Sequence, residues 1–362
     1  MAKRRIAIIG LGMAVTPHAK SLLDLADRVD VAAAYSPTPA RRAAFGTRFP
    51  FPLTGDLDAL IDDPSIDAAI VLSPPRTHLP LVQRLAAAGK HILLEKPVEA
   101  DTGRAEALVD ACEGAGVTLA VVFQQRFRPA ALLLRERVQA GALGEIAAAS
   151  VSARWWRPQG YYDEPGRGTL ERDGGGVLMT QAIHVLDLFL TLTPPVVEVT
   201  AFAGTTALHR METEDIAAGA LRFGNGAIGA FDASTASYPG FPERIELTGT
   251  LGTAVFVRGR VEFSWHDGRR EALGDPLPVG LSADPMAAPN DAHRELLREF
   301  LDALDAGRRP VNDGRAALGV HYLIDAILAS SRGRSPCPVR TAADRDAPAA
   351  GATLRNPVFA AH

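Results

Sequence analysis

The sequence predicts two domains, an α/β domain with a doubly wound parallel sheet and an α+β domain with a large, mainly antiparallel sheet. The chain has 362 residues, 47% of them hydrophobic, and single cores stop growing at roughly 250 to 300 residues. Short apolar runs alternate with helix-like segments up to residue 123, and β-rich runs separated by turn residues begin near Ile146. We therefore expect a Rossmann domain over residues 1–123, an α+β domain over residues 124–340 and a loosely held tail over residues 341–362.

The elements of the first domain follow from apolar runs of strand length with helical spacing between them. Strands are expected at residues 6–9, 31–34, 68–72, 91–94 and 119–123. Helices are expected at residues 17–26, 39–45, 57–61, 79–88 and 103–113. This alternation is typical of a parallel sheet with helices on both faces.

The second domain shows β-type runs with four helical interruptions. Strands are expected at residues 147–154, 196–203, 215–223, 227–233, 244–248 and 253–257. Helices are expected at residues 129–139, 176–192, 292–306 and 314–330, and the last two are amphipathic, so they should pack back on the first domain. Asn225-Gly226 predicts a hairpin whose two turn positions both have positive φ.

Composition favours a small-molecule ligand over a macromolecular partner. The net charge is -4 with acidic and basic residues interleaved, so the sequence offers no basic stripe for nucleic acid and no polybasic membrane anchor. No apolar stretch approaches the roughly 20 residues of a membrane span. The two cysteines, Cys112 and Cys337, are far apart and suggest neither a disulfide framework nor a thiolate metal site, which favours the cytoplasm.

A glycine loop follows the first predicted strand. Gly10-Leu11-Gly12-Met13 lies where the strand ends and a helix begins, so backbone amides and the positive helix end can meet a pyrophosphate. Val15 stands where a third small residue is usual. The alternative is an ordinary tight turn.

The end of the second strand lacks the acid that NAD enzymes usually offer to the ribose. Ser36 and Thr38 can donate hydrogen bonds there, and Arg41 or Arg42 can pair with a 2'-phosphate. NADP is therefore preferred, with NAD possible. The alternative is that both arginines face solvent.

The fourth predicted strand runs into Glu95-Lys96-Pro97, at the sheet edge where open α/β folds bind ligands. With the loop Ser73-Pro74-Pro75-Arg76-Thr77-His78, this motif resembles the glucose-fructose oxidoreductase, inositol dehydrogenase and MocA (Gfo/Idh/MocA) family, from Gly10 to about Pro338. The resemblance implies that Lys96 lies beside the substrate hydroxyl and the nicotinamide and that Pro97 fixes its loop. A partly desolvated lysine can accept or share a proton as hydride leaves. Further cofactor contacts are expected from Ser73, Pro74, Thr77, His78, Glu95 and Gln125.

A second motif runs from Asp173 through three glycines to Asp187. The glycines should let the backbone pass close to a ligand, and helical spacing should put Thr180, His184 and Asp187 on one face. His184 could take the substrate proton, with Asp187 orienting its ring. The family resemblance implies a catalytic histidine at His184, although many members have an aspartate where this chain has Thr180. A buried core histidine is the alternative, and no metal is expected, because no second His or Cys falls at ligand spacing.

Substrate contacts are expected from an aromatic and arginine-rich loop and from nearby polar residues, because aromatic faces stack on sugar rings. The candidates are Lys96, Arg126, Arg154, Trp155, Trp156, Tyr161, Arg167, Thr180, Gln181 and His184. The loop could instead be a core cluster or a subunit contact, and Arg126 could simply brace the crossover between domains. His209, Glu212 and His293 have no surroundings in the sequence that suggest a role.

These observations predict an NAD(P)-dependent dehydrogenase acting on a secondary hydroxyl or ketone of a sugar, cyclitol or related polyol. A catalytically silent nucleotide-binding regulator of the same fold is the alternative. A third possibility is net hydrolysis or isomerisation through transient oxidation. A homodimer or homotetramer formed through the second domain is expected, because a sheet of this size usually has a face to cover.

Overall fold

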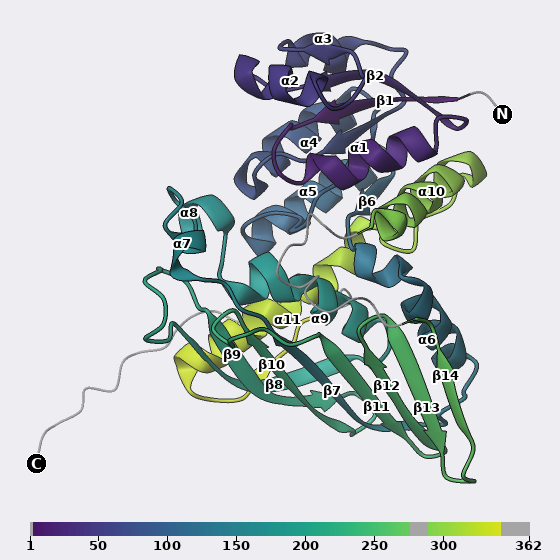
Figure 1. Ribbon diagram of the computed structural model, residues 1–362, viewed down its shortest axis with the longest axis vertical. Helices are drawn as coiled ribbons and strands as arrows, with labels where there is room; N and C mark the ends of the chain where they lie inside the picture. The colour runs from purple at the N-terminus through teal and green to yellow at the C-terminus, as the bar shows by residue number, and fades with distance from the viewer. Residues whose placement is uncertain (1–2, 276–288, 342–362) are drawn as a thin grey trace, which may run out of the picture.

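Two sheets, stacked end to end along the long axis, organise the chain (Figure 1). The computed structural model describes residues 3–275 and 289–341. The predicted tail therefore lies, apart from residue 341, outside the described residues. Both predicted sheet types are present, so the predicted fold class is confirmed; the domain boundary at residue 123 stays a prediction.

The first sheet is parallel throughout and has the order β3-β2-β1-β4-β5-β6. Its strands are β1 (Arg4–Ile9), β2 (Val29–Tyr35), β3 (Leu53–Thr54), β4 (Ala68–Val71), β5 (His91–Leu94) and β6 (Leu119–Val121). Its helices are α1 (Val15–Asp24), α2 (Pro39–Gly46), α3 (Leu57–Asp62), α4 (His78–Ala87) and α5 (Thr102–Gly114). β4 is buried at every position, as expected for a strand with both faces covered. The sequence missed only β3, whose two residues are too few for a strand pattern.

The second sheet has the order β14-β13-β12-β11-β7-β10-β9-β8-β15 and is antiparallel except for the β7–β10 pair. Its strands are β7 (Ile146–Arg154), β8 (Val196–Gly204), β9 (Ile216–Phe223), β10 (Ile228–Ser234), β11 (Arg244–Gly249), β12 (Gly252–Val257), β13 (Arg260–Trp265), β14 (Arg270–Leu273) and β15 (Cys337–Pro338). The sequence missed β13, β14 and β15. The first two alternate charged with apolar residues near turns, and β15 is too short to predict.

The predicted hairpin joins β9 to β10, but its turn differs from the prediction. Gly226 has φ +88°, whereas Asn225 is not among the residues with positive φ, so the expectation for Asn225 was wrong. Its amide instead forms side-chain bonds: Oδ1 accepts from Ala227 N at 3.1 Å, and Nδ2 donates to Ile146 O at 2.8 Å. These bonds fix the turn without a left-handed asparagine.

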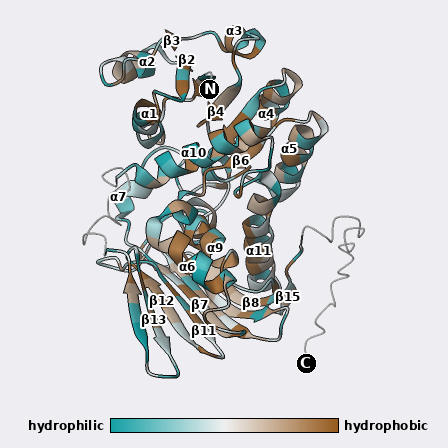
Figure 2. Cartoon of the chain, turned by 90° about the vertical axis from the view of Figure 1, so that its right-hand side faces the viewer, coloured by the Kyte–Doolittle hydropathy of each residue, from teal (hydrophilic) through white to brown (hydrophobic). Residues whose placement is uncertain are grey.

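Helices fill the space between the two sheets (Figures 1 and 2). α6 (Pro129–Gln139), α9 (Ile183–Leu190) and α11 (Gly314–Gly333) lie on the inner side of the second sheet. α10 (Asp291–Ala306) packs against α1, and its Leu297 and Phe300 are fully buried in one core with Ile8 of β1. The prediction that α10 returns to the first domain is thus confirmed; α11 contacts α5 but also lies along β8 and α9.

The predicted helix over residues 176–192 is interrupted. A π-helical segment, η3 (Leu178–Ala182), precedes α9. Short helical segments also occur at η1 (Pro75–Thr77), η2 (Gln124–Phe127), α7 (Gln159–Tyr162) and α8 (Leu170–Asp173). Because a π turn winds more loosely than an α turn, it rotates the residues after it away from the face that α-helical spacing predicts.

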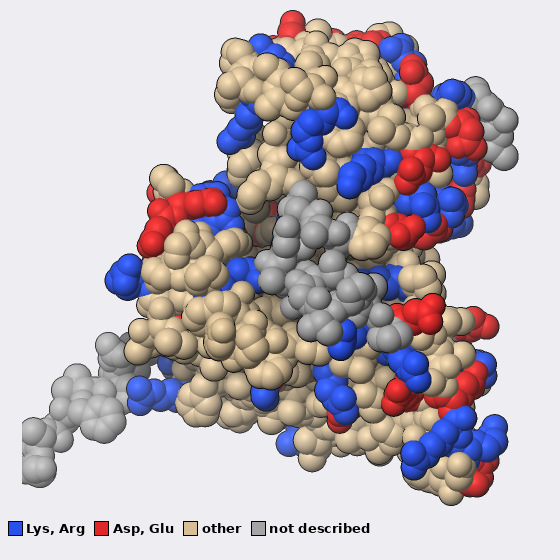
Figure 3. Space-filling model, in the orientation of Figure 1, with Lys and Arg blue, Asp and Glu red and all other residues tan. Residues whose placement is uncertain are grey.

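Acidic and basic side chains lie next to each other along the right-hand side of the molecule in Figure 3. Pairs such as Arg4–Asp305 at 3.0 Å and Arg84–Asp58 at 2.5 Å join them. Within the described residues, no helix combines the length and the apolar character needed to cross a bilayer.

Candidate active site

The glycine loop between β1 and α1 is built for close backbone approach. Gly10 has φ +108°, and a Cβ there would lie 2.8 Å from the carbonyl of Leu72. A Cβ at Gly12 would meet nothing within 4 Å. Val15 is buried in the core beneath the loop. The loop is therefore tight on its protein side and open at Gly12, which fits the approach of a dinucleotide pyrophosphate.

Two of the predicted cofactor residues form side-chain hydrogen bonds within the turn after β2. Ser36 is 1% exposed, and its Oγ accepts from Thr38 N at 3.3 Å. Arg42 Nη1 donates to Ser36 O at 2.5 Å. Arg41 and Thr38 are exposed, and no partner of the Arg41 side chain occurs in the described part of the chain. Thr38 and Arg41 are thus the groups that remain available to a ribose or its phosphate.

The loop after β4 is braced from below by His78. Its Nε2 lies 2.8 Å from Ser73 O and its Nδ1 lies 3.1 Å from Val98 O, and burial lowers its pKa. Thr77 Oγ1 lies 2.7 Å from both Ser73 Oγ and Pro74 O. The imidazole is fully buried, so it shapes the loop rather than presenting itself on the open side.

Lys96, directly after β5, connects the sheet edge to the second domain. Its Nζ donates to the Thr180 carbonyl at 2.6 Å. Burial lowers the pKa of Lys96, while the charges of Glu95 and Asp173 oppose that shift. Glu95 Oε2 accepts from Lys96 N at 2.8 Å. The amine is thus held in a partly desolvated position where it can exchange a proton.

A cavity of about 200 Å³ opens beside Lys96. Its lining comes from the β4–α4 loop, the β5 end, the stretch from α7 to the π segment and the β8–β9 connection: Pro75, Lys96, Pro97, Tyr161, Tyr162, Arg167, Gly168, Asp173, Gly175, Gly176, Thr180 and Met211. Four predicted substrate residues are brought together there: Lys96, Tyr161, Arg167 and Thr180. A second cavity of about 370 Å³, between α5 and the α10–α11 connection, contains none of the predicted site residues.

Tyr161 and Arg167 form the aromatic and cationic side of this cavity. The Arg167 guanidinium carbon lies 4.1 Å from the centre of the Tyr161 ring, and Arg167 Nη2 donates to Glu164 Oε2 at 2.6 Å. Gln181 extends the polar edge, because its Nε2 donates to Tyr161 Oη at 3.4 Å and its Oε1 accepts from Thr180 Oγ1 at 2.9 Å. The wall offers a ring face, a cation and hydroxyl groups together.

His184 lies close to Lys96 but does not line the cavity. Burial and the Lys96 charge lower its pKa well below the ordinary value, so the imidazole is neutral at pH 7. Its Nδ1 is buried and has no hydrogen-bond partner among the described residues, and its ring stands edge to face with Phe123 at 6.2 Å. The ring is therefore held by packing, with no carboxylate to orient it.

The predicted pairing of Asp187 with His184 is wrong. Both Asp187 carboxylate oxygens accept from Arg126, at 2.6 Å from Nε and 2.5 Å from Nη2. Arg126 Nη1 also donates to Val311 O at 2.9 Å. Both side chains are almost fully buried, and a buried charge needs a partner. Arg126 therefore braces the crossover between the domains, the alternative to a substrate contact.

Other sequence candidates lie away from the cavity. Trp155 is a core residue, and Trp156 packs against Tyr238 and His209. Arg154 is paired with Asp232 on the neighbouring strand of the sheet. The cofactor candidate Gln125 is buried after β6, and its Oε1 has no partner among the described residues.

Gly175 and Gly176 line the cavity, as a close approach to a ligand requires, and the glycine run also serves protein packing. A Cβ at Gly176 would lie 2.0 Å from Glu214 O, and one at Gly174 would lie 2.7 Å from Ala100 Cβ. Glu214, buried before β9, accepts from Gly176 N and Leu178 N at 3.2 Å each, and burial raises its pKa. Glu214 thus caps the π segment, and nothing near it in the sequence signals this role.

Sequence reasoning did not single out Gly168 and Met211, which line the cavity, and it placed Tyr162 and Asp173 in its motifs without giving either one a role. Asp173 immediately precedes the glycine run, so its position could have marked it. His209 has no exposed side-chain surface and forms a pair with Asp215 at 2.7 Å, because β9 brings that acid beneath the aromatic loop.

Comparisons with known proteins agree with the two-sheet fold. Residues 4–123 match the family model "Oxidoreductase family, NAD-binding Rossmann fold", and residues 131–255 match "GFO/IDH/MocA C-terminal domain". Inositol 2-dehydrogenase of Rhizobium meliloti is 27% identical over 340 residues, which cover 90% of this chain and 96% of that protein. D-xylose 1-dehydrogenase (NADP(+)) 2 of Haloferax volcanii is 28% identical over 322 residues, covering 83% and 90%. The crystal structure of the WlbA dehydrogenase from Bordetella pertussis in complex with NADH and UDP-GlcNAcA aligns with a TM-score of 0.82 at 28% identity, covering 93% of this chain and 98% of that one.

Proposed function

Because the chain belongs to the Gfo/Idh/MocA family of oxidoreductases, we propose that it oxidises a secondary hydroxyl of a sugar or cyclitol, or reduces the corresponding ketone. One observation carries this proposal. The half-buried Lys96 amine lies at the carboxyl edge of the NAD-binding sheet, reaches Thr180 of the second domain at 2.6 Å and lines the same cavity as Tyr161 and Arg167. A proton-exchanging group thus stands between a dinucleotide cradle and a pocket with sugar-binding chemistry.

The glycine loop from Gly10 to Met13 would hold the pyrophosphate, and the loops after β4 and β5 would flank the nicotinamide. A bound nicotinamide supplies the hydride acceptor or donor at C4. NADP is the proposed preference, since β2 ends without an acid and Arg41 is free to pair with a 2'-phosphate. The relative from Haloferax volcanii carries NADP(+) in its name, whereas the solved Bordetella pertussis structure contains NADH.

Lys96 is proposed to accept the hydroxyl proton during oxidation. The carbinol C–H bond breaks as hydride leaves, the O–H proton passes to the Lys96 amine, and a carbonyl forms. Asp173 lines the same cavity and stabilises the resulting ammonium. In family members that have an aspartate in place of Thr180, that carboxylate would share this task. The predicted catalytic role of His184 remains a proposal, because its neutral imidazole lies near Lys96 but outside the cavity lining.

The substrate class follows from the cavity wall. Tyr161 offers a ring face, Arg167 offers a cation, and Thr180 and Asp173 offer hydrogen-bonding oxygens. This set suits one polyol ring, and Arg167 also suits a ring that bears a carboxylate. The enzyme names of the relatives, which act on inositol and xylose, agree with this class.

A panel of hexoses, pentoses, inositols and uronic acids, followed at 340 nm with NADP and NAD, tests the proposal. Lys96→Met should lower kcat by about 10²- to 10⁴-fold, the usual contribution of a positioned acid or base, while dinucleotide binding persists. Lys20→Met, on the exposed side of α1, is the matched control and should retain full activity. Dinucleotide binding without turnover on the whole panel would instead favour the silent regulator.

A homo-oligomer and a cytoplasmic location are also proposed. The second sheet carries exposed apolar residues on β8 and β10, with Phe202 at 73% and Ile228 at 62% exposure, and these favour a covering subunit. Cys112 and Cys337 are free thiols, which suits a reducing compartment. Light scattering at several protein concentrations tests the first point, because a strictly monomeric mass would refute it.

A further inference from the structure

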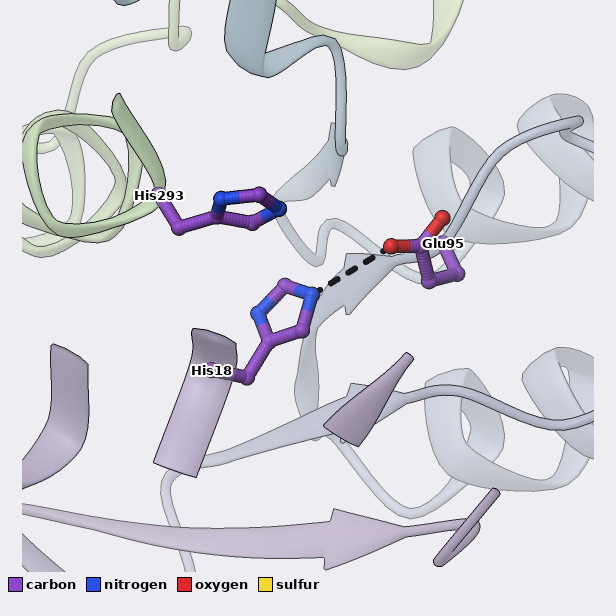
Figure 4. A group of neighbouring side chains, drawn as sticks. All are labelled: His18, Glu95 and His293. Atoms are coloured by element: carbon purple, nitrogen blue, oxygen red, sulfur yellow. Dashed lines mark hydrogen bonds and ion pairs between the residues drawn. The ribbon is translucent and has the colours of Figure 1, made fainter. Parts of the chain in front are cut away.

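Three side chains from distant segments meet behind the Lys96 strand end (Figure 4). His18 comes from α1, Glu95 follows β5, and His293 lies in the first turn of α10. One ligand atom from each lies within 4.8 Å of the other two, and His18 Nε2 is 3.3 Å from Glu95 Oε1. Sequence spacing could not reveal this cluster, because α10 returns to the first domain only in the folded chain.

His293 is the unexplained member of this cluster. Its ring stands edge to face with that of His18, with the centroids 5.1 Å apart. No hydrogen bond to either of its ring nitrogens occurs within residues 3–275 and 289–341. Figure 4 shows one of these nitrogens directed toward Glu95 and His18. A half-buried imidazole therefore points an unused lone pair or N–H at a carboxylate that already has one imidazole partner.

Metal coordination needs a neutral imidazole and an ionised carboxylate. Burial lowers the pKa of His293 to about 3, so its imidazole is neutral at pH 7. Burial alone would raise the pKa of Glu95, but the hydrogen bond from His18 and the charge of Lys96 lower it to about 2. Arg128, a cation that also acts on His293, is paired with Glu243 at 2.7 Å.

We propose that His18, Glu95 and His293 bind one divalent first-row transition metal ion such as Zn²⁺, Co²⁺ or Ni²⁺. Tetrahedral ligands at about 2.1 Å from zinc lie about 3.4 Å apart, which the His18–Glu95 distance already matches. A small swing of the His293 ring completes the set. Two imidazoles and one carboxylate favour these metals over Mg²⁺ and Ca²⁺, which prefer oxygen ligands.

The bound ion joins α1, the end of β5 and α10, three elements that are far apart in sequence. It lies on the opposite side of Glu95 from the Lys96 backbone, since Oε2 accepts from Lys96 N while Oε1 faces His18. The ion therefore acts as a clamp between the C-terminal helix and the nucleotide-binding sheet and takes no part in hydride transfer. Because it binds the folded chain, it raises stability by mass action.

Cobalt titration of chelator-treated full-length protein tests the site. One equivalent should bind and give the visible d–d absorption of a low-coordinate Co²⁺ site without a thiolate charge-transfer band. His293→Gln removes a ligand from a half-buried position and should weaken binding at least tenfold. The matched control His266→Gln changes an exposed histidine and should bind as the parent does. Absence of stoichiometric binding to the parent, or equal binding by the parent and His293→Gln, would overturn the proposal.

Thermal unfolding provides a second readout that does not depend on catalysis. Zn²⁺ should raise the midpoint of the parent and of His266→Gln, whereas Mg²⁺ at the same concentration should not. The midpoint of His293→Gln should not respond to Zn²⁺. His18→Gln serves as a second ligand variant if His293→Gln folds poorly, and an undiminished response to Zn²⁺ in that variant would also count against the site.

Discussion

Replacing Asp187 with alanine should destabilise the fold rather than disable a correctly folded active site. The Asp187 side chain is 1% exposed and that of Arg126 is 6% exposed. Removing one partner of such a buried pair leaves the other charge unpaired and costs about 3 to 5 kcal/mol. With an unfolding entropy of about 2.1 cal/mol/K per residue, a chain of 362 residues should lose about 4 to 7 °C in thermal midpoint.

Calorimetry measures this loss, and two variants control it. Glu262→Ala removes a partner of the Arg260–Glu262 pair, whose side chains are 39% and 59% exposed, so it should cost less than about 1 kcal/mol. The double variant Arg126→Met/Asp187→Leu replaces the pair with apolar side chains and should regain most of the lost stability. If Asp187→Ala unfolded at the parental temperature but lost kcat, the carboxylate would be serving catalysis and our account of the pair would fail.

Three further predictions concern the candidate active site. Asp173→Asn removes a charge that raises the pKa of Lys96. Since oxidation needs the neutral amine, the rising limb of the pH profile of kcat/KM should move to lower pH. An unchanged pH profile would show that Asp173 does not influence the titration of Lys96. Gly10→Ala places a Cβ 2.8 Å from the Leu72 carbonyl at a residue with φ +108°. Dinucleotide affinity, measured by fluorescence titration, should therefore fall about tenfold or more. An affinity equal to that of the parent would show that the glycine loop does not bind the dinucleotide. Arg41→Ala should raise KM for NADPH about tenfold and spare KM for NADH, whereas an equal change for both would refute the NADP preference.

The sequence predicted best what depends on short stretches of chain. Every parallel strand except β3 was found from its apolar run, and the Glu95-Lys96-Pro97 motif was correctly located at a strand end. The family resemblance is confirmed by models that match residues 4–123 and 131–255. Parallel strands end at one edge of a sheet, so knowing the strand ends was enough to bring the glycine loop and Lys96 together.

The errors concern partners that only the folded chain supplies. His184 and Asp187 both lie in α9, so their helical spacing is as predicted, but Arg126 of η2 occupies both carboxylate oxygens of Asp187. The π segment before α9 changes only the offset of these two residues from Thr180. The glycine run was predicted to make room for a ligand, but the packing of Gly176 against Glu214, which precedes β9, was not predicted. Strand β9 lies on the second sheet, and its register cannot be derived from the glycine segment.

The same limit explains why buried charges were the least predictable part of the site. A buried carboxylate needs a donor, but the sequence does not say which of 38 lysines and arginines will supply it. Arg126 forms an ion pair with Asp187 and thereby connects η2 to α9. The Thr180 carbonyl that holds Lys96 lies in the π segment directly before α9. The Arg126–Asp187 pair therefore also holds the Thr180 carbonyl at its distance from Lys96. An Asp187→Ala protein that still folds should show a raised KM for the polyol, while its dinucleotide binding is retained.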